Sequence, residues 1–334
     1  MTWEGYQMNT KSRLFKAVSD KELRMCSRTY LGEELRSARL LDGGLFNTTY
    51  RLETATRSTI LRLGPVNREY LLPYERRLME AEQLAGALLH SHEIPTSTIL
   101  AVDCSKRLLD RDIMVVDCLP GVSLSTIEVS ADKSREINFL TGTLTKKLHG
   151  ITAGELPQPF SRPYGRIGSV VAGYGGASWS EALRIEVQLW RQQAETIDLF
   201  TKEEFDRFEG IFRQFSALFD AGCQSPRLVH ADLWAGNLLV DAEGKLLALI
   251  DCDRAIFGDP EFEFAAGWLA GEDFCRGYSA WPDASPEGVL RRRLYHFLLN
   301  LEDCYVHLGE YNNEAEGKAL CAEVLEELNN LERL

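Results

Sequence analysis

The sequence predicts an α+β protein of two lobes, a small β-rich N-terminal lobe and a larger α-helical C-terminal lobe. Short apolar segments of strand length dominate the first part of the chain, and long amphipathic segments dominate the second. The change falls at Asp117-Cys118-Leu119-Pro120-Gly121, where Pro and Gly after a buried strand indicate a hinge. With 334 residues, 45% of them hydrophobic, the chain can build two cores. We therefore expect lobes at residues 1–118 and 119–334.

The N-terminal lobe is expected to contain a helix, a five-stranded sheet and a second helix. Leu78, Leu84 and Leu88 recur at helical spacing and indicate the second helix, whereas apolar runs ended by Gly or Pro indicate the strands. The expected elements are a helix at 10–36, two short strands within Leu40–Leu52, a strand at Ser58–Leu63, a helix at Tyr74–Leu89, and strands at Ser97–Val102 and Arg111–Val116.

The C-terminal lobe is expected to be helical, with a few short strands inserted between its third and fourth helices. The expected helices are Lys133–Leu148, Ser178–Ala194, Lys202–Ala221, Glu287–Leu308 and Glu314–Leu331, and the expected strands are Arg227–His230, Leu238–Val240 and Lys245–Ile250. A cleft between two such lobes is a usual place for a ligand.

Composition narrows the class of partner. The net charge of −13 argues against a nucleic-acid partner, which requires a basic face, and suits a cationic ligand. No apolar run approaches the roughly 18 residues of a membrane span, and the N-terminus lacks the pattern of a secretion signal. Eight cysteines without a C-x-x-C pair indicate reduced thiols. We expect a cytoplasmic protein with small-molecule partners; the oligomeric state is left open.

The segment His230-Ala231-Asp232-Leu233-Trp234-Ala235-Gly236-Asn237, followed by Asp251, has the residue types that phosphoryl transfer requires. Asp232 is the expected catalytic base, because a carboxylate in a loop after a strand can orient an acceptor hydroxyl and take its proton. Asn237 and Asp251 are the expected Mg²⁺ ligands, since Mg²⁺ prefers oxygen donors. His230 is expected to support the loop, and Asp253 either to lie behind the metal ligands or to pair with Arg254.

Residues of the N-terminal lobe are expected to hold the phosphates of ATP or GTP. Gly43 and Gly44, with Asn47, form a possible hairpin over the phosphates, although the same pattern also suits an ordinary turn. Arg62 ends a predicted strand, and Glu80 on the next helix is its expected ion-pair partner. Glu82 would point elsewhere, because two residues correspond to about 200° of helix.

A second glycine-rich stretch, Gly165 to Gly176, lacks the lysine of a Walker A motif and a clear preceding strand. We expect a flexible segment that borders the acceptor site.

Together these motifs make the chain, from Leu40 to Trp268, resemble the aminoglycoside phosphotransferase and choline kinase-like superfamily, whose fold is related to that of protein kinases. The marks are the His230–Asn237 loop, in which Asn follows Asp by five residues as in protein kinases, then Ile250-Asp251-Cys252-Asp253-Arg254-Ala255 and Gly258-Asp259-Pro260-Glu261-Phe262-Glu263. The absence of an A-P-E segment argues against a protein kinase.

The resemblance implies a bilobal, protein-kinase-like fold and a role for each motif. It implies Asp232 as base, Asn237 and Asp251 on Mg²⁺, Arg62 on the α- and β-phosphates with Glu80 positioning it, and the backbone of Asp117, Cys118 and Leu119 against the purine. The chain departs from the family at Ala231, where Gly is frequent, and at Glu263, where Asp is usual in a segment that buttresses the catalytic loop.

We predict a small-molecule O-phosphotransferase that uses ATP or GTP with Mg²⁺ and acts on an aminoglycoside or a similar hydroxylated amine. One alternative is a metabolite kinase for a sugar, a fructosamine-like adduct or choline. Another is a pseudokinase that binds nucleotide without turnover.

Overall fold

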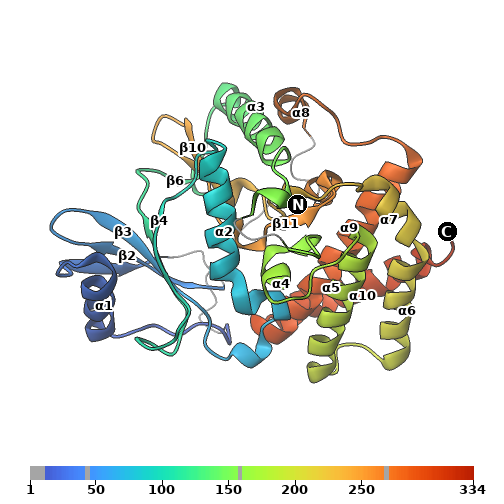
Figure 1. Cartoon of the computed structure of the whole chain (residues 1–334), viewed down its shortest axis with the longest axis horizontal. Helices are drawn as coiled ribbons and strands as arrows, with labels where there is room; N and C mark the ends of the chain where they lie inside the picture. Colours follow the sequence, from blue (N-terminus) through green and yellow to red (C-terminus); the bar gives the residue numbers. More distant parts are fainter. Residues whose placement is uncertain (1–11, 42–45, 157–159, 267–270) are drawn as a thin grey trace.

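The computed structural model describes residues 12–41, 46–156, 160–266 and 271–334, and it places them in two lobes, as expected (Figure 1). The N-terminal lobe is built on an antiparallel sheet of strand order β1-β2-β3-β5-β4. Its strands are β1 Ser37–Leu40, β2 Thr48–Glu53, β3 Ser58–Leu63, β4 Ile99–Asp103 and β5 Ile113–Asp117. The central strand, β3, has the bounds predicted from the sequence.

The N-terminal helix is shorter than the predicted 10–36. Helix α1 covers Asp20–Cys26 and continues as one wider turn to Leu31. Ser19 and Glu22 form a capping box that starts the helix, and Gly32, at φ 68°, ends it. These local signals override the wider apolar periodicity that suggested one long helix.

Helix α2, Leu78–Ser91, lies between the sheet and the helical lobe (Figure 1). Met79 packs against Met114 and Val116 of the sheet. Ala81 and Ala85 belong instead to a core shared with helical-lobe side chains. The helix is therefore packed into both lobes, although it precedes the hinge.

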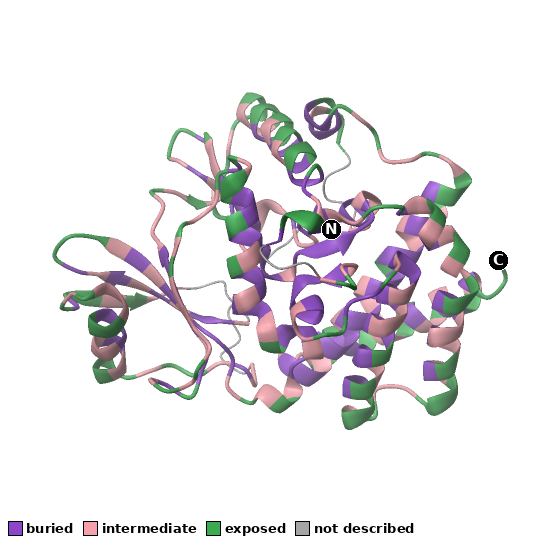
Figure 2. Ribbon diagram, viewed as in Figure 1, coloured by how far each residue is buried: buried purple, intermediate pink, exposed green. Residues whose placement is uncertain are grey.

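The C-terminal lobe is mainly helical, and its core is rich in aromatic side chains. Its helices are α3 Ala131–Leu148, α4 Ile167–Val171, α5 Trp179–Ala194, α6 Lys202–Gln214, α7 Ser216–Gly222, α8 Glu272–Tyr278, α9 Pro286–Tyr305 and α10 Glu314–Leu331. Figure 2 shows buried residues on the sides of these helices that face one another. Among the helices of the described ranges, none has the length and apolar character needed to cross a bilayer.

The helix predicted at Lys202–Ala221 is interrupted. Helices α6 and α7 meet at Phe215, where the hydroxyl of Ser216 donates to the carbonyl oxygens of Phe212 (3.1 Å) and Arg213 (2.9 Å). Such side-chain bonds compete with the backbone ladder and account for the break.

Two small three-stranded sheets, of order β10-β9-β6 and β7-β11-β8, hold the loops that face the cleft. Their strands are β6 Val122–Ser123, β7 Gly165–Arg166, β8 Arg227–Val229, β9 Leu238–Val240, β10 Leu246–Leu249 and β11 Ile256–Gly258. Because β8, β9, β10 and β11 flank both predicted catalytic segments, this pairing brings the two segments together.

Both ends of the glycine-rich stretch 165–176 are closely packed, where a flexible segment was expected from its composition, whereas Gly173 and Tyr174 within it are exposed. Tyr164 and Gly176 form a backbone bridge, and a Cβ on Gly175 would lie 2.0 Å from the carbonyl oxygen of Arg162. Its glycines thus permit close backbone approach.

Candidate active site

The loop after β8 places Asp232 beside Asn237. The side-chain amide of Asn237 donates to the backbone oxygen of Asp232 (2.7 Å) and to its Oδ2 (2.9 Å). Leu233 is buried and anchors the loop. These contacts fix the Asp232 carboxylate and leave its Oδ1 available to an acceptor hydroxyl.

A buried carboxylate supports this loop from behind. Glu263 accepts hydrogen bonds from the backbone N–H groups of His230 (2.8 Å) and Ala231 (3.1 Å), and its Oε2 lies 3.3 Å from Nε2 of His149. Burial opposes the ionised form, but the hydrogen bond with His149 and the nearby histidine charges lower the pKa of Glu263. Ala231 is held at φ 65°, a left-handed conformation that costs a non-glycine residue about 1–2 kcal/mol.

Asp251 stands next to the same loop. The backbone N–H of Ile250 donates to the carbonyl oxygen of Asn237 (3.0 Å), and Nε2 of His230 lies 3.0 Å from the carbonyl oxygen of Ile250. His230 thus supports the backbone, as we expected of it. Asp251 itself is at φ 64°, so that both loops carry a strained residue at the cleft.

Asn237 and Asp251 suit a divalent cation in their donor chemistry. The Nδ2 of Asn237 is engaged with Asp232, so its Oδ1 remains for a metal. Asp251 uses Oδ1 to accept from Arg62 (2.7 Å), and Oδ2 remains. Two such oxygens, completed by phosphates and water, form a typical Mg²⁺ site in proteins.

Arg62 pairs with Glu82, and the prediction of Glu80 as its partner is wrong. Nη1 of Arg62 lies 2.5 Å from each carboxylate oxygen of Glu82, whereas Glu80 is half-buried and pairs with Arg77. The reason is the orientation of α2: Met79, Glu82 and Gly86 form the stripe that faces the sheet, with Gly86 against Ile99 of β4. The spacing of Glu82 to Met79 and Gly86 was a signal that could have identified it.

Sequence reasoning also missed the full extent of the charge cluster around Arg62. Carboxylate oxygens of Glu82, Asp251 and Asp253 all lie within 4.8 Å of one another. Nη2 of Arg62 is 3.5 Å from Asp253, whereas Arg254 pairs with Glu75 (3.6 Å). Of the two roles expected for Asp253, the ion pair with Arg254 is therefore absent, and Asp253 lies in the cluster beside Asp251.

The cluster carries more negative than positive charge. Burial opposes the Arg62 cation, yet the surrounding carboxylates raise its pKa. Burial and the charge of Asp251 raise the pKa of Asp253 well above its usual range, whereas the Arg62 charge outweighs burial and lowers the pKa of Asp251. The cluster is therefore suited to receive additional positive charge.

Asp232 has a raised pKa. Burial is the main cause and the charge of Asp251 adds to it, while Arg254 acts in the opposite direction. Arg254 was not singled out from the sequence for this effect. A carboxylate whose pKa is raised toward neutrality is a stronger base.

The hinge lies beside the catalytic loop. Asp117 ends β5, Cys118 and Leu119 follow it, and the hydroxyl of Ser123 donates to the carbonyl oxygen of Gly236 (2.9 Å). Asn47 precedes β2 and is buried; its Oδ1 has no hydrogen-bond partner among the described residues. Gly43 and Gly44 lie outside the described residues.

The model of the phosphotransferase enzyme family (APH) matches residues 37–302, which include both loops and Arg62. A chloroplastic protein-ribulosamine 3-kinase from Oryza sativa subsp. indica is 33% identical over 103 residues, 28% of this chain and 28% of that protein. A hygromycin-B 4-O-kinase from Escherichia coli is 32% identical over 101 residues, 28% of this chain and 29% of that protein. The chain thus spans under a third of the length of these curated relatives.

Solved structures share the fold over nearly the whole chain. A streptomycin–ATP ternary complex of APH(2")-IIa has a TM-score of 0.62 at 14% identity and covers 93% of this chain and 97% of its own. A candidate fructosamine-3-kinase from Haemophilus somnus 129PT has a TM-score of 0.64 at 15% identity, with coverages of 91% and 97%. At such low identity these likenesses support the kinase-like fold alone.

Proposed function

The chain belongs to the phosphotransferase enzyme family, and on this premise we propose that it transfers a phosphoryl group from ATP or GTP to a hydroxyl of an aminoglycoside or similar hydroxylated amine. Asp232 accepts the hydroxyl proton, and Asn237 and Asp251 hold Mg²⁺. Arg62 contacts the α- and β-phosphates, and the backbone at Asp117–Leu119 meets the purine. The setting we propose is cytoplasmic.

The observation that carries this proposal is the bond between Asn237 and Asp232 beside Asp251. It fixes one carboxylate toward an acceptor while leaving one oxygen on each of Asn237 and Asp251 for a cation. When bound, Mg²⁺ would neutralise charge on the phosphates. The protein contributes positioning and electrostatic stabilisation, and no covalent enzyme intermediate is needed.

The choice of a cationic acceptor rests on charge and on relatives. A net charge of −13 attracts cations. The relatives include a hygromycin-B 4-O-kinase, and streptomycin is bound in a structure of the same fold.

A second candidate is a metabolite kinase for a ketosamine-type adduct. It is favoured by the 33% identity to a protein-ribulosamine 3-kinase over 103 residues, against 32% over 101 residues for the hygromycin kinase. Both candidates use the same phosphoryl-transfer site and differ only in the acceptor.

The test is nucleotide consumption by the purified chain with Mg²⁺ and ATP or GTP, against panels of aminoglycosides, other antibiotics and hydroxylated metabolites. Asp232→Ala serves as the inactive control, and Asp206→Ala, an exposed aspartate on α6, as the matched active one. Asp232-dependent turnover of an aminoglycoside supports the proposal. Turnover confined to ribulosamine- or fructosamine-type adducts establishes the second candidate, and silence across both panels refutes both acceptors.

A further inference from the structure

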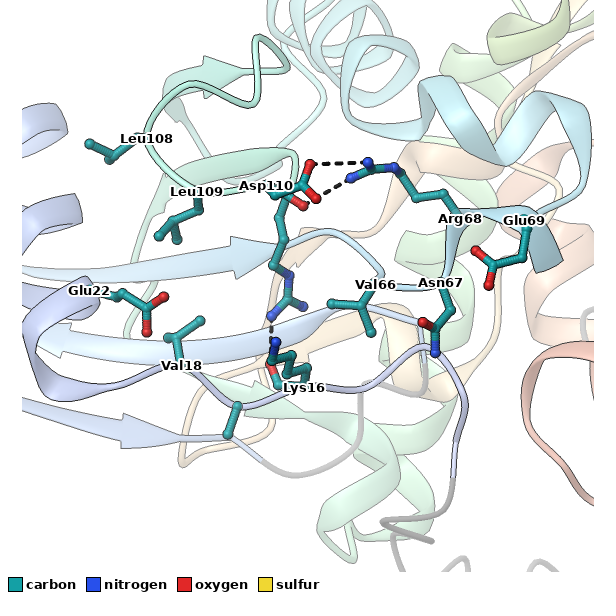
Figure 3. A pocket seen from close by; sticks show the side chains of 12 residues that line it. Lys16, Val18, Glu22, Val66, Asn67, Arg68, Glu69, Leu108, Leu109 and Asp110 are labelled. Atoms are coloured by element: carbon teal, nitrogen blue, oxygen red, sulfur yellow. Dashed lines mark hydrogen bonds and ion pairs between the residues drawn. The ribbon is translucent and has the colours of Figure 1, made fainter.

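A cavity of about 600 Å³ lies in the N-terminal lobe, outside the cleft site (Figure 3). The segment before α1, α1 itself, the loop after β3 and the loop before β5 line it, and one side is open to solvent. Its apolar lining side chains are Val18, Val66, Leu108 and Leu109, and its basic ones are Lys16, Arg68 and Arg111.

Arg111 is the unusual residue of this cavity. It is only 5% exposed, and its guanidinium donates to the carbonyl oxygens of Gly64 (2.6 Å), Lys16 (2.5 Å) and Leu63 (3.2 Å) and to the hydroxyl of Thr48 (2.8 Å). All four acceptors are neutral. Arginine has five N–H groups, so these bonds leave one on Nη1 for another acceptor.

Other buried arginines of the protein have an acidic ion-pair partner, which Arg111 lacks among the described residues. Arg166 pairs with Glu302, and Arg291 pairs with Asp259 at 3.0 Å. Arg111 forms no ion pair with any residue that the structure describes, and burial lowers its pKa to about 10, so the side chain stays charged at neutral pH. Buried charges are normally paired, because desolvation is costly.

The acidic side chains around the cavity are engaged elsewhere or lie apart. Glu22 accepts from the backbone and hydroxyl of Ser19 through Oε2 in the α1 cap. Burial lowers the pKa of Arg111 and the charge of Glu22 acts to raise it, but the two side chains form no ion pair. Asp110 pairs with Arg68, a contact drawn in Figure 3. Glu69 is exposed and lies beyond Asn67 as seen from Lys16. Lys16, by contrast, is exposed and enters no ion pair within the described ranges.

We propose that this cavity binds a small organic anion, a carboxylate or phosphate group on a short apolar body, between Lys16 and Arg111. The anionic group supplies the direct ion pair that no described residue forms with Arg111. The apolar body contacts the valine and leucine walls. The ligand would lie where Arg111 ties the end of β3, which carries Arg62, to the start of β2.

The test is calorimetric titration of the full chain with hexanoate and with hexyl phosphate, which separate the two anionic groups. Hexanol and hexylammonium are the controls for the apolar body alone and for opposite charge. Lys16→Gln, at an exposed position that leaves the fold intact, is compared with Lys21→Gln, an equal charge change on α1 that does not line the cavity.

At least one of the anions is expected to bind the wild type and Lys21→Gln equally, and Lys16→Gln about tenfold or more weakly, as loss of one charged hydrogen-bond partner requires. Binding of hexanol as tight as that of the anions overturns the proposal. So does equal affinity in Lys16→Gln, or the absence of binding by both anions. None of these readouts depends on phosphoryl transfer.

Discussion

The two sides of the cleft are held by different kinds of contact. The catalytic loop is fixed by bonds to backbone groups, from Glu263 to two amides and from Asn237 to the Asp232 carbonyl oxygen. The guanidinium of Arg62, opposite, is held by the carboxylates of Glu82 and Asp251. Backbone bonds fix a position whatever ligand is present, whereas an ionic cluster responds to any charge that enters. The loop is therefore preorganised, and the Arg62 cluster is the part that would adjust to the proposed nucleotide and cation.

The largest effect is expected at the preorganised side. Asp232→Ala should lower kcat by about 10²–10⁴-fold, the usual contribution of a general base, while nucleotide still binds. Steady-state kinetics and calorimetry measure the two quantities. Retained turnover would remove Asp232 as the base.

Across the cleft, Asp251→Ala should abolish Mg²⁺-dependent nucleotide binding, because it removes a proposed metal ligand and an Arg62 partner together. Calorimetric titration of nucleotide with Mg²⁺ and with a chelator measures this directly. Unchanged Mg²⁺-dependent binding would place the metal elsewhere. The two variants would then no longer differ in nucleotide binding.

Glu82→Gln and Glu80→Gln are a matched pair on one helix. Loss of a charged hydrogen-bond partner costs about 1.5–3 kcal/mol, so kcat/KM for the nucleotide should fall roughly tenfold or more in Glu82→Gln. Glu80→Gln, which loses only a contact with Arg77, should stay within about twofold of wild type. Equal losses in the two variants would refute the assignment of Glu82.

The last expected effect is on stability and lies behind the loop. Glu263→Gln replaces one acceptor oxygen by a donor facing a backbone N–H, which should cost about 1–3 kcal/mol of unfolding free energy at neutral pH. Because the native pKa of Glu263 lies below its ordinary 4.5, the ion stabilises the fold above that pH, and this contribution is lost as pH falls through the native pKa.

Urea unfolding of wild type and Glu263→Gln at several pH values should therefore show a difference that shrinks below about pH 4.5. A difference independent of pH would mean that the charge of Glu263 does not hold the loop.

Sequence reasoning succeeded where the information is local. The apolar run of β3 gave its bounds, and the five-residue spacing placed Asp232 and Asn237 in one loop. It failed where the helix face had to be chosen: the packing of Met79 against the sheet turns Glu82, and not Glu80, toward Arg62, and the spacing of Glu82 to Met79 is the signal that was overlooked. The pairing of Arg254 with Glu75, 179 positions apart, by contrast has no local signal.

Helix α2 packs against both lobes, and this packing bears on how the cleft could open. Ala81 and Ala85 pack the helix into a core of helical-lobe side chains. If α2 stays in this core when the cleft opens, β3 and β4 would slide over the stripe of Met79, Glu82 and Gly86. Such sliding would stretch the Arg62–Glu82 pair, so the ionic contact that holds the Arg62 side chain would also resist opening.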